Sequence, residues 1–306
     1  MNAVAQSSER AVAPSDILLI LRARGYFPDG EPFAVGRPDR TTIPLLTDSA
    51  HPVVAKIYSD DGGEACFTNM QALWSSSFGE RRDPPGLPRP IEYLREHRVL
   101  VLERVAGRAL AEMGEPDAGA VQDAVRLAAA LHGSDARPTR RRSARGILRS
   151  LRRKAERITR LDSMLGAKVE RVVDAVEESR RKEHELVPSH GDFSPRNVLV
   201  GPDRSVLIDW DRFQLADPAR DVAYFGTWCW VDRLRRGETR SWSVLEDAAA
   251  AYEALRPESD IASRLAFHVA AGLVRIAEGL VTLWTEDAHL APLLLEEALS
   301  RGEGAL

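Results

Sequence analysis

The chain has 306 residues, enough for a large core and too many for one small domain, so two lobes are expected. Apolar residues make up 44% of it and charged residues 29%, a balance typical of soluble globular proteins, and the net charge is −4. No run approaches the roughly 20 apolar residues that cross a bilayer, and the N-terminal residues lack the apolar core of a signal peptide. The two cysteines, Cys66 and Cys229, have no metal-ligand spacing and fit a reducing cytoplasm, where we expect the protein to be located.

The N-terminal third carries the turn residues and short apolar runs of a small sheet. Ser15 and Asp16 begin a short helix that is expected to end near Gly25. Alternating apolar residues then predict several strands and one helix, which end at a turn at Gly107. The strands are expected at 32–35, 41–46, 53–58, 91–94 and 99–102, and the helix at 63–76.

From Gly107 onward the apolar period becomes helical. The fold class is therefore α+β, with an N-terminal lobe over residues 1–106 and a C-terminal lobe over residues 107–306. Two charged amphipathic helices, broken near Gly166, are expected in a basic segment at 137–183. The other helices are expected at 118–131, 245–255, 262–284 and 288–300, and two short strands at 198–200 and 206–208.

The most informative segment reads His-Gly-Asp-Phe-Ser-Pro-Arg-Asn at residues 190–197, followed by Ile-Asp-Trp-Asp at 208–211. A carboxylate and an amide on one loop, with a second carboxylate beyond a short apolar strand, can hold metal-bound nucleotide beside a hydroxyl group. Taken singly, an aspartate in such a loop is usually a turn former or a helix cap. The combination of Asp192, Asn197 and Asp209 favours the catalytic interpretation.

These motifs, together with Asp-Pro-Ala-Arg-Asp at 217–221, resemble those of the aminoglycoside phosphotransferase family, which also includes choline and homoserine kinases. The resemblance is most specific over residues 187–225. It implies a two-lobed protein-kinase-like fold, with a small antiparallel-sheet N-lobe and a mostly helical C-lobe. It also implies an enzyme that phosphorylates small molecules, with ATP or GTP and Mg²⁺ as its cofactors.

The family pattern assigns roles in the catalytic segment. Asp192 would accept the proton of the substrate hydroxyl, while Asn197 and Asp209 would be ligands of Mg²⁺. A small number of hard oxygen donors suits Mg²⁺, because this ion completes its shell with water and phosphate oxygens. His190 is interpreted as a structural residue that bonds the loop backbone, and Asp221 as a brace of the catalytic loop.

The resemblance also assigns nucleotide-binding residues to the N-terminal lobe. Lys56 would neutralise the α- and β-phosphates and pair with Glu64 of the following helix, the alternative being an exposed lysine on an edge strand. The backbone carbonyl of Glu103 and the backbone amide of Val105 would hold the adenine. The glycine-rich phosphate loop of protein kinases is absent, since Gly36 is the only glycine in the candidate loop.

Charge is the only indication of the acceptor. Residues 137–182 hold sixteen lysines and arginines against six acids, and residues 187–306 hold nineteen acids against twelve arginines. The basic stretch lacks interleaved aromatic residues, which favours a solvated helical face over nucleic-acid binding. The acidic part suits a cationic acceptor, with candidate pocket residues at Asp211, Asp232, Glu238, Glu286 and Asp287. Asp211 is equally well interpreted as a metal-shell group or a member of a salt bridge.

We therefore expect an ATP- and Mg²⁺-dependent phosphotransferase that acts on a hydroxyl of a small molecule, with an aminoglycoside or another antibiotic as the first choice. If the arginines of residues 137–182 face inward, a neutral or anionic acceptor becomes the better choice. The alternatives are a metabolite kinase of the choline or homoserine type and, in a different class, a non-catalytic nucleotide-binding module. No nucleic-acid or membrane partner is expected.

Overall fold

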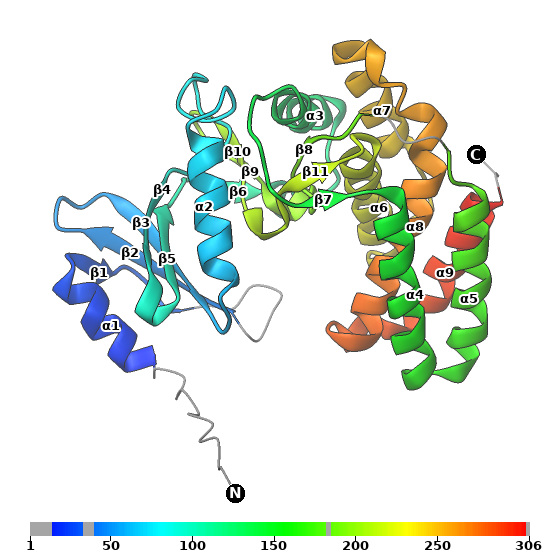
Figure 1. The fold of residues 1–306 in the computed structure, drawn as a ribbon, viewed down its shortest axis with the longest axis horizontal. Coiled ribbons are helices and arrows are strands. Elements are labelled where there is room, and N and C mark those ends of the chain that lie inside the picture. The colour runs from blue at the N-terminus through cyan, green and yellow to red at the C-terminus, as the bar shows by residue number, and fades with distance from the viewer. Residues whose placement is uncertain (1–13, 33–39, 182–184, 304–306) are drawn as a thin grey trace, which may run out of the picture. The chain divides into compact units, whose positions relative to one another are not determined.

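The structure is a computed structural model that describes residues 14–32, 40–181 and 185–303 (Figure 1). The chain divides into two compact units, one built on an antiparallel sheet and one mostly helical, which confirms the α+β class. We call them the sheet unit and the helical unit. The sheet unit comprises Met1–Thr68 and Arg89–Val105, and the helical unit comprises Asn69–Pro88 and Ala106–Leu306.

The sheet unit contains a five-stranded antiparallel sheet in the order β1-β2-β3-β5-β4, so β3 has a neighbour on each side. Helix α1 precedes the sheet, and helix α2 begins in this unit and ends in the other. The elements are α1 (Pro14–Ala23), β1 (Tyr26–Pro28), β2 (Arg40–Thr47), β3 (Pro52–Tyr58), α2 (Gly62–Trp74), β4 (Pro90–Leu94), the 3₁₀ turn η1 (Arg95–His97) and β5 (Val99–Glu103).

One apolar cluster holds this sheet to α1. Ile17 and Leu21 of α1 are buried against alternate residues of the strands, among them Leu45, Ala55 and Val101. The register pairs Ala55 with Val101 across β3 and β5, so their side chains share one face. The strands expected at 41–46, 53–58, 91–94 and 99–102 are confirmed. Strand β1 was not expected, and both the strand expected at 32–35 and Gly36 reach into residues 33–39, outside the described part of the chain.

The helical unit combines long helices with two three-stranded sheets, in the orders β10-β9-β6 and β7-β11-β8. The expected helices and the strands near 198–200 and 206–208 are confirmed, and α6 is an additional long helix. The elements are β6 (Arg108–Ala109), η2 (Leu110–Met113), α3 (Ala118–His132), β7 (Arg141–Arg142), α4 (Ala144–Leu161), α5 (Ser163–Glu178), β8 (Val187–Ser189), η3 (Pro195–Asn197), β9 (Val198–Val200), β10 (Ser205–Leu207), η4 (Trp210–Arg212), β11 (Gln214–Ala216), α6 (Ala219–Arg235), α7 (Ser243–Leu255), η5 (Pro257–Ser259), α8 (Ala262–Thr282), η6 (Thr285–Leu290) and α9 (Ala291–Gly302).

Helix α8 is the centre of the helical unit, where it packs against α4, α5, α6 and α9 (Figure 1). By length and composition it is apolar enough to cross a membrane, which the sequence analysis expected of no run, and no other helix in the described part of the chain is. However, 78% of its most apolar window is buried inside the unit, as expected of the core helix of a soluble domain. Three charged residues, Arg264, Arg275 and Glu278, nevertheless lie on α8, and all three make ion pairs.

The basic segment folds into α4 and α5, which pack against each other. The break between them lies at Asp162 rather than near Gly166, because the Asp162 carboxylate accepts hydrogen bonds from the backbone N–H groups of Met164 and Leu165 and so begins α5. Gly166 stays within α5, where a Cβ would collide with Thr159. Most arginines of the two helices are exposed, as their amphipathic pattern indicates.

Candidate active site

Two short sheets bring the catalytic segments together. The register of β8 with β11 places Ser189 opposite Gln214, so the residues that follow β8 lie beside those that precede β11. The register of β9 with β10 places Val198 opposite Leu207, and the N–H of Ile208 donates to the carbonyl of Asn197 at 3.0 Å. The loop that carries Asp192 and Asn197 is therefore adjacent to the segment that carries Asp209.

His190 links the two segments. Its Nδ1 accepts a hydrogen bond from the backbone N–H of Asp192 at 3.3 Å, so Nε2 carries the proton and donates to the carbonyl of Ile208 at 2.8 Å. The ring is fully buried and packs against Trp210. His190 thus bonds the loop backbone, as the sequence analysis expects, and is not positioned as a base.

Gly191 explains why this loop reads His-Gly-Asp. Its φ is +78°, and a Cβ would lie 2.4 Å from the Arg212 carbonyl oxygen and 2.5 Å from the side-chain nitrogen of Gln214. A larger residue would push the loop away from η4.

Asp221, in the first turn of α6, holds the loop through hydrogen bonds to its backbone. Its two carboxylate oxygens accept the N–H groups of His190 at 2.7 Å and of Gly191 at 3.0 Å, and Oδ2 also lies 3.2 Å from Nε2 of His132. Burial on its own raises the pKa of this carboxyl, but the hydrogen bond and charge of His132 and the charge of Arg220 outweigh it and bring the pKa to about 2. His132 is in turn bonded to the hydroxyl of Tyr252 at 2.7 Å.

Asn197 offers an amide oxygen, and Asp209 has an unusual backbone conformation. The Nδ2 group of Asn197 donates to the carbonyl of Asp192 at 2.9 Å, which leaves its amide oxygen as the group that can bind a cation. Asp209 adopts a left-handed backbone conformation, with φ +65° and ψ +66°, immediately before η4. Such a conformation is unfavourable for residues other than glycine, asparagine and aspartate, and it recurs at functional sites.

Asp192 contacts two arginines from distant elements. Its Oδ1 accepts a hydrogen bond from Nη2 of Arg275 at 2.5 Å, and its Oδ2 lies 3.6 Å from Nε of Arg212. Arg275 belongs to α8, 83 residues away in the sequence, and was not among the predicted site residues. The signal that could have found it is a basic residue within an otherwise apolar helix, because such a group needs a buried partner.

In the sheet unit, Lys56 lies on β3 and Glu64 in the first turn of α2. The ammonium of Lys56 lies 5.4 Å from the centre of the Tyr58 ring. Glu64 forms an ion pair with Arg95 of η1, a partner that the sequence analysis did not expect. Both side chains of this pair are exposed to solvent, Glu64 less than Arg95.

Glu103 and Val105 lie at the end of β5. The N–H of Glu103 is bonded to the carbonyl of Arg89 at 2.9 Å, and the Glu103 carboxylate accepts the N–H of Arg89 at 2.9 Å. Val105 lies outside regular structure, and within residues 40–181 and the other described ranges its N–H makes no hydrogen bond. That N–H is thus able to bind a ligand, as the adenine assignment requires.

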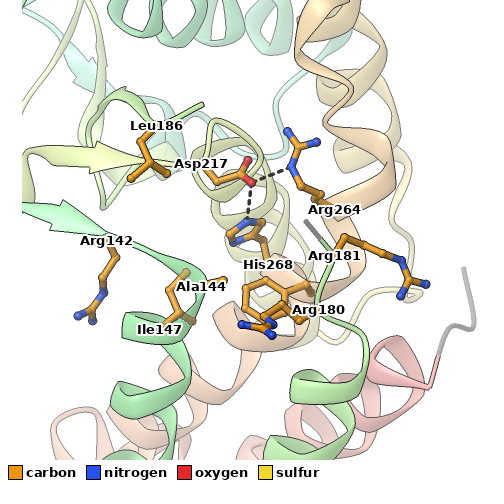
Figure 2. Close-up of a pocket in the computed structure, with 10 residues that line it drawn as sticks. Arg142, Ala144, Ile147, Arg180, Arg181, Leu186, Asp217, Arg264 and His268 are labelled. Carbon is orange, nitrogen blue, oxygen red and sulfur yellow. Dashed lines mark hydrogen bonds and ion pairs between the residues drawn. The ribbon is translucent and has the colours of Figure 1, made fainter. Parts of the chain in front are cut away.

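A pocket lies where β7, α4, the end of α5 and α8 meet (Figure 2). The volume of this pocket is about 320 Å³, which includes space that is open to solvent. Asp217 is bonded to Nε of Arg264 at 2.7 Å and lies 3.6 Å from Nε2 of His268, and Figure 2 shows Arg142 on the opposite side of the pocket from Arg264. The lining residues are Arg142, Ala144, Ile147, Arg180, Arg181, Leu186, Asp217, Arg264, Phe267 and His268.

Comparison with known proteins gives one family and several similar folds. Residues 45–257 match the family described as "Phosphotransferase enzyme family". No curated protein sequence matches the chain. The solved structures that it resembles include a thermostable mutant of aminoglycoside phosphotransferase APH(4)-Ia, with a TM-score of 0.69 and 17% identity over 93% of this chain and 98% of that one.

Two further structures are similar over most of their length. Spectinomycin phosphotransferase APH(9)-Ia has a TM-score of 0.62 and 14% identity, over 96% of this chain and 98% of that one. A choline/ethanolamine kinase family protein from Mesorhizobium loti has a TM-score of 0.54 and 13% identity, over 90% and 88%. At these identities the similarity concerns the fold, and it confirms the fold that the sequence motifs imply.

Proposed function

The chain belongs to the phosphotransferase enzyme family, and on that premise we propose that it moves the γ-phosphate of ATP, with Mg²⁺, onto a hydroxyl group of a small molecule. The observation that carries the proposal is the bonded arrangement of one loop. Asn197 is bonded to the Asp192 carbonyl through its side chain and to Ile208 through its own carbonyl, so the catalytic aspartate, the amide and Asp209 are held in fixed relation.

In the proposed reaction the acceptor hydroxyl oxygen forms a bond to the γ-phosphorus while the bond from that phosphorus to the β,γ-bridging oxygen breaks. ADP leaves, and the hydroxyl proton passes to a carboxylate oxygen of Asp192. The loop contacts of His190 and Asp221 hold the Asp192 backbone in place, so positioning supplies much of the catalysis.

The residues present fit Mg²⁺. The donors would be the amide oxygen of Asn197 and a carboxylate oxygen of Asp209, both hard ligands. Among the residues that the structure describes, no group of three or more His, Cys, Asp or Glu side chains forms a metal cluster, and a Mg²⁺ site with few protein ligands needs none. When bound, the ion would neutralise charge on the phosphate oxygens.

For the nucleotide we propose Lys56 as a phosphate ligand and the backbone of Glu103 and Val105 as the adenine contacts, with GTP as the alternative to ATP. Lys56 lies on β3, an interior strand of the sheet unit, and the Val105 N–H makes no hydrogen bond within the described ranges. Similar folds have been solved with nucleotide, for example the APH(4)-Ia mutant with AMP-PNP and hygromycin B. These observations support nucleotide binding without identifying the base.

The test is transfer of labelled phosphate from ATP or GTP to a panel of hydroxyl compounds, with and without Mg²⁺, combined with calorimetric titration of AMP-PNP. The proposal expects nucleotide binding that depends on Mg²⁺ and a phosphorylated acceptor from the panel. Nucleotide binding without any transfer, and without slow hydrolysis of ATP, would favour the non-catalytic module. Absence of nucleotide binding would contradict both.

A further inference from the structure

Arginine side chains converge on the candidate catalytic aspartate from three elements of the helical unit. Arg212 of η4 and Arg275 of α8 contact the two oxygens of Asp192, as described above. Arg275 and Arg220, the latter at the start of α6, both donate to the carbonyl of Gly191 at 3.1 Å. A single carboxylate and a single peptide carbonyl therefore share three guanidinium groups.

Arg220 retains unused hydrogen-bonding capacity. Its Nη1 is buried and has no hydrogen-bond partner among the residues that the structure describes. Leaving a buried donor unsatisfied costs about 1–3 kcal/mol and is uncommon in native proteins, so such a group is normally completed by ordered water, an ion or a bound molecule. The unsatisfied N–H belongs to a side chain that already contacts the loop of Asp192, which places the missing partner at the candidate active site.

Arg142 of β7 adds a fourth guanidinium group. Within the described ranges its guanidinium makes no ion pair or hydrogen bond, and the residue is only partly exposed. Burial, followed by the positive charges of Arg140, Arg275 and Arg212, lowers its pKa. Arg142 also lines the pocket of Figure 2, so a dissolved molecule can reach it.

The nearby carboxylates do not balance this charge. Asp221 offsets part of the charge of Arg220 and Arg275, and Asp209 is the proposed ligand of Mg²⁺. Glu278, one turn beyond Arg275 on α8, is bonded to Lys154 and Arg157. The charges of Arg140 and Asp211 are opposite and cancel in this balance. The Arg140 guanidinium donates a hydrogen bond to the backbone carbonyl of Asp211 at 3.3 Å. Arg142, Arg212, Arg220 and Arg275 therefore outnumber Asp192 and Asp221, the two carboxylates that remain to face them.

The carboxylates proposed to hold a cationic acceptor are largely engaged by arginines. Asp232 is bonded to Arg196 and Arg235, both at 3.1 Å. Asp287 forms an ion pair with Arg235 at 2.8 Å, and Glu238 forms one with Arg236 at 2.5 Å. A polyamine would have to displace these arginines, whereas an anion meets guanidinium groups that already point toward the catalytic loop.

We propose that the acceptor of this enzyme is an anionic hydroxyl compound, whose carboxylate or phosphate group is bound by Arg142, Arg220 and Arg275 while its hydroxyl faces Asp192. The inference rests on the proposed phosphotransferase function and names its substrate class. A planar guanidinium group matches two oxygens of a carboxylate or phosphate, so binding of the anion would satisfy Nη1 of Arg220. It would also share the Arg275 guanidinium that otherwise holds Oδ1 of Asp192.

A charge-matched panel tests the substrate class. Glucuronate, glucose and glucosamine share a sugar scaffold and differ in charge, as do glycerate, glycerol and ethanolamine in a smaller series, and hygromycin B and kanamycin add polycations. The proposal expects the best anionic acceptor to exceed the best neutral or cationic one in kcat/KM by about tenfold or more. A cationic or neutral compound as the best acceptor overturns it, and the phosphotransferase function then stands without it.

The second arm needs no acceptor to be identified. Binding of inorganic phosphate is measured calorimetrically while Mg²⁺ and AMP-PNP fill the nucleotide site, so that the γ-phosphate position is not available. Wild-type protein should bind phosphate, and Arg142→Gln should weaken that binding by about tenfold. The control is Arg149→Gln, which removes the same charge from an exposed position on α4 and should leave phosphate binding as in the wild type.

Undetectable phosphate binding, or binding that Arg142→Gln and Arg149→Gln weaken equally, overturns the inference. Failure to bind AMP-PNP would instead count against the proposed function, so the two failures are distinguishable. A charge reversal separates an acceptor contact from a structural role: Arg142→Glu should shift preference within the sugar series away from glucuronate and toward glucosamine. A structural role would lower all three rates together.

Discussion

At the scale of single residues, Asp192 is held by more groups than a loop aspartate requires. Its N–H is bonded to His190, its carbonyl accepts the side chain of Asn197, and its carboxylate meets Arg275. Rotation of the side chain away from the acceptor would break the last of these contacts. The carboxylate is therefore held in one orientation, which the proposed role as proton acceptor requires.

Replacement of Asp192 by alanine should reduce turnover by about a thousandfold or more while nucleotide affinity stays within a few-fold, because this carboxylate is expected to contact the acceptor and not the nucleotide. Transfer of labelled phosphate gives the rate, and titration with AMP-PNP gives the affinity. Asp203→Ala is the matched control, since Asp203 is exposed between β9 and β10. Near-wild-type turnover in Asp192→Ala would remove Asp192 from the mechanism.

Asp209→Asn should weaken Mg²⁺-dependent nucleotide binding and turnover together. The neutral amide keeps an oxygen donor but loses the charge that balances the cation, so the effect should be about tenfold or larger on the affinity for AMP-PNP in the presence of Mg²⁺. In the absence of Mg²⁺ the variant and the wild type should bind nucleotide equally. If the two affinities differ as much without the ion as with it, Asp209 is not a metal ligand.

At the scale of elements, α6 acts on the catalytic loop through Asp221. Asp221→Asn should lower the free energy of unfolding at pH 7 by about 2–3 kcal/mol, because the buried residue loses the charge that brings its pKa to about 2, well below its ordinary value. The sign follows from that depression: the stabilisation is present above about pH 4 and is lost as the pH falls toward 2.

The measurement for Asp221 is urea unfolding at pH 7 and at pH 3. The difference between wild type and Asp221→Asn should shrink at the lower pH, whereas Asp203→Asn should resemble the wild type at both. A difference that stays constant between pH 7 and pH 3 would show that the charge of Asp221 does not stabilise the fold.

Elements also differ in how well the sequence predicts them. Strands β3 and β5 were predictable, since alternating apolar residues bounded by turn residues specify them locally. Strand β1 has three residues and exists through its pairing with β2, so it has no local pattern. Helix α6 is buried along most of its length and lacks the polar face that makes a helix recognisable. The start of α5 depends on a side-chain cap, which the glycine signal at 166 obscured.

The same distinction applies to the site. Asp192, Asn197 and Asp209 follow a local spacing, and the structure brings their segments together. Arg275 lies 83 residues from Asp192 and meets it only after α8 has packed into the core, so no spacing could have predicted that contact. Glu64 was expected beside Lys56 by analogy, and its ion pair with Arg95 depends on where the turn before β5 places that arginine.

At the scale of the whole molecule, each unit has an apolar core of its own. Leu45 is fully buried in the cluster that joins α1 to the sheet, whereas the core of the helical unit surrounds α8. Stability in a chain of this kind need not be uniform, because a unit with its own core can open without unfolding the other. The nucleotide contacts proposed for Lys56 and Val105 would then depend on the sheet unit, and the acceptor contacts on the helical unit.

Leu45→Ala should therefore destabilise the sheet unit selectively. Removing this buried side chain costs about 2–5 kcal/mol, because the close-packed sheet cannot fill the cavity that it leaves. Amide hydrogen exchange should accelerate in β2, β3 and β5 and stay unchanged in α8, and the affinity for AMP-PNP should fall. Leu19→Ala is the control, since Leu19 of α1 is 64% exposed and its loss should change little. Equal acceleration of exchange in α8 would mean that the two units unfold as one cooperative structure. A mutation in the sheet unit could not then weaken nucleotide binding without also disturbing the arginine cluster around Asp192.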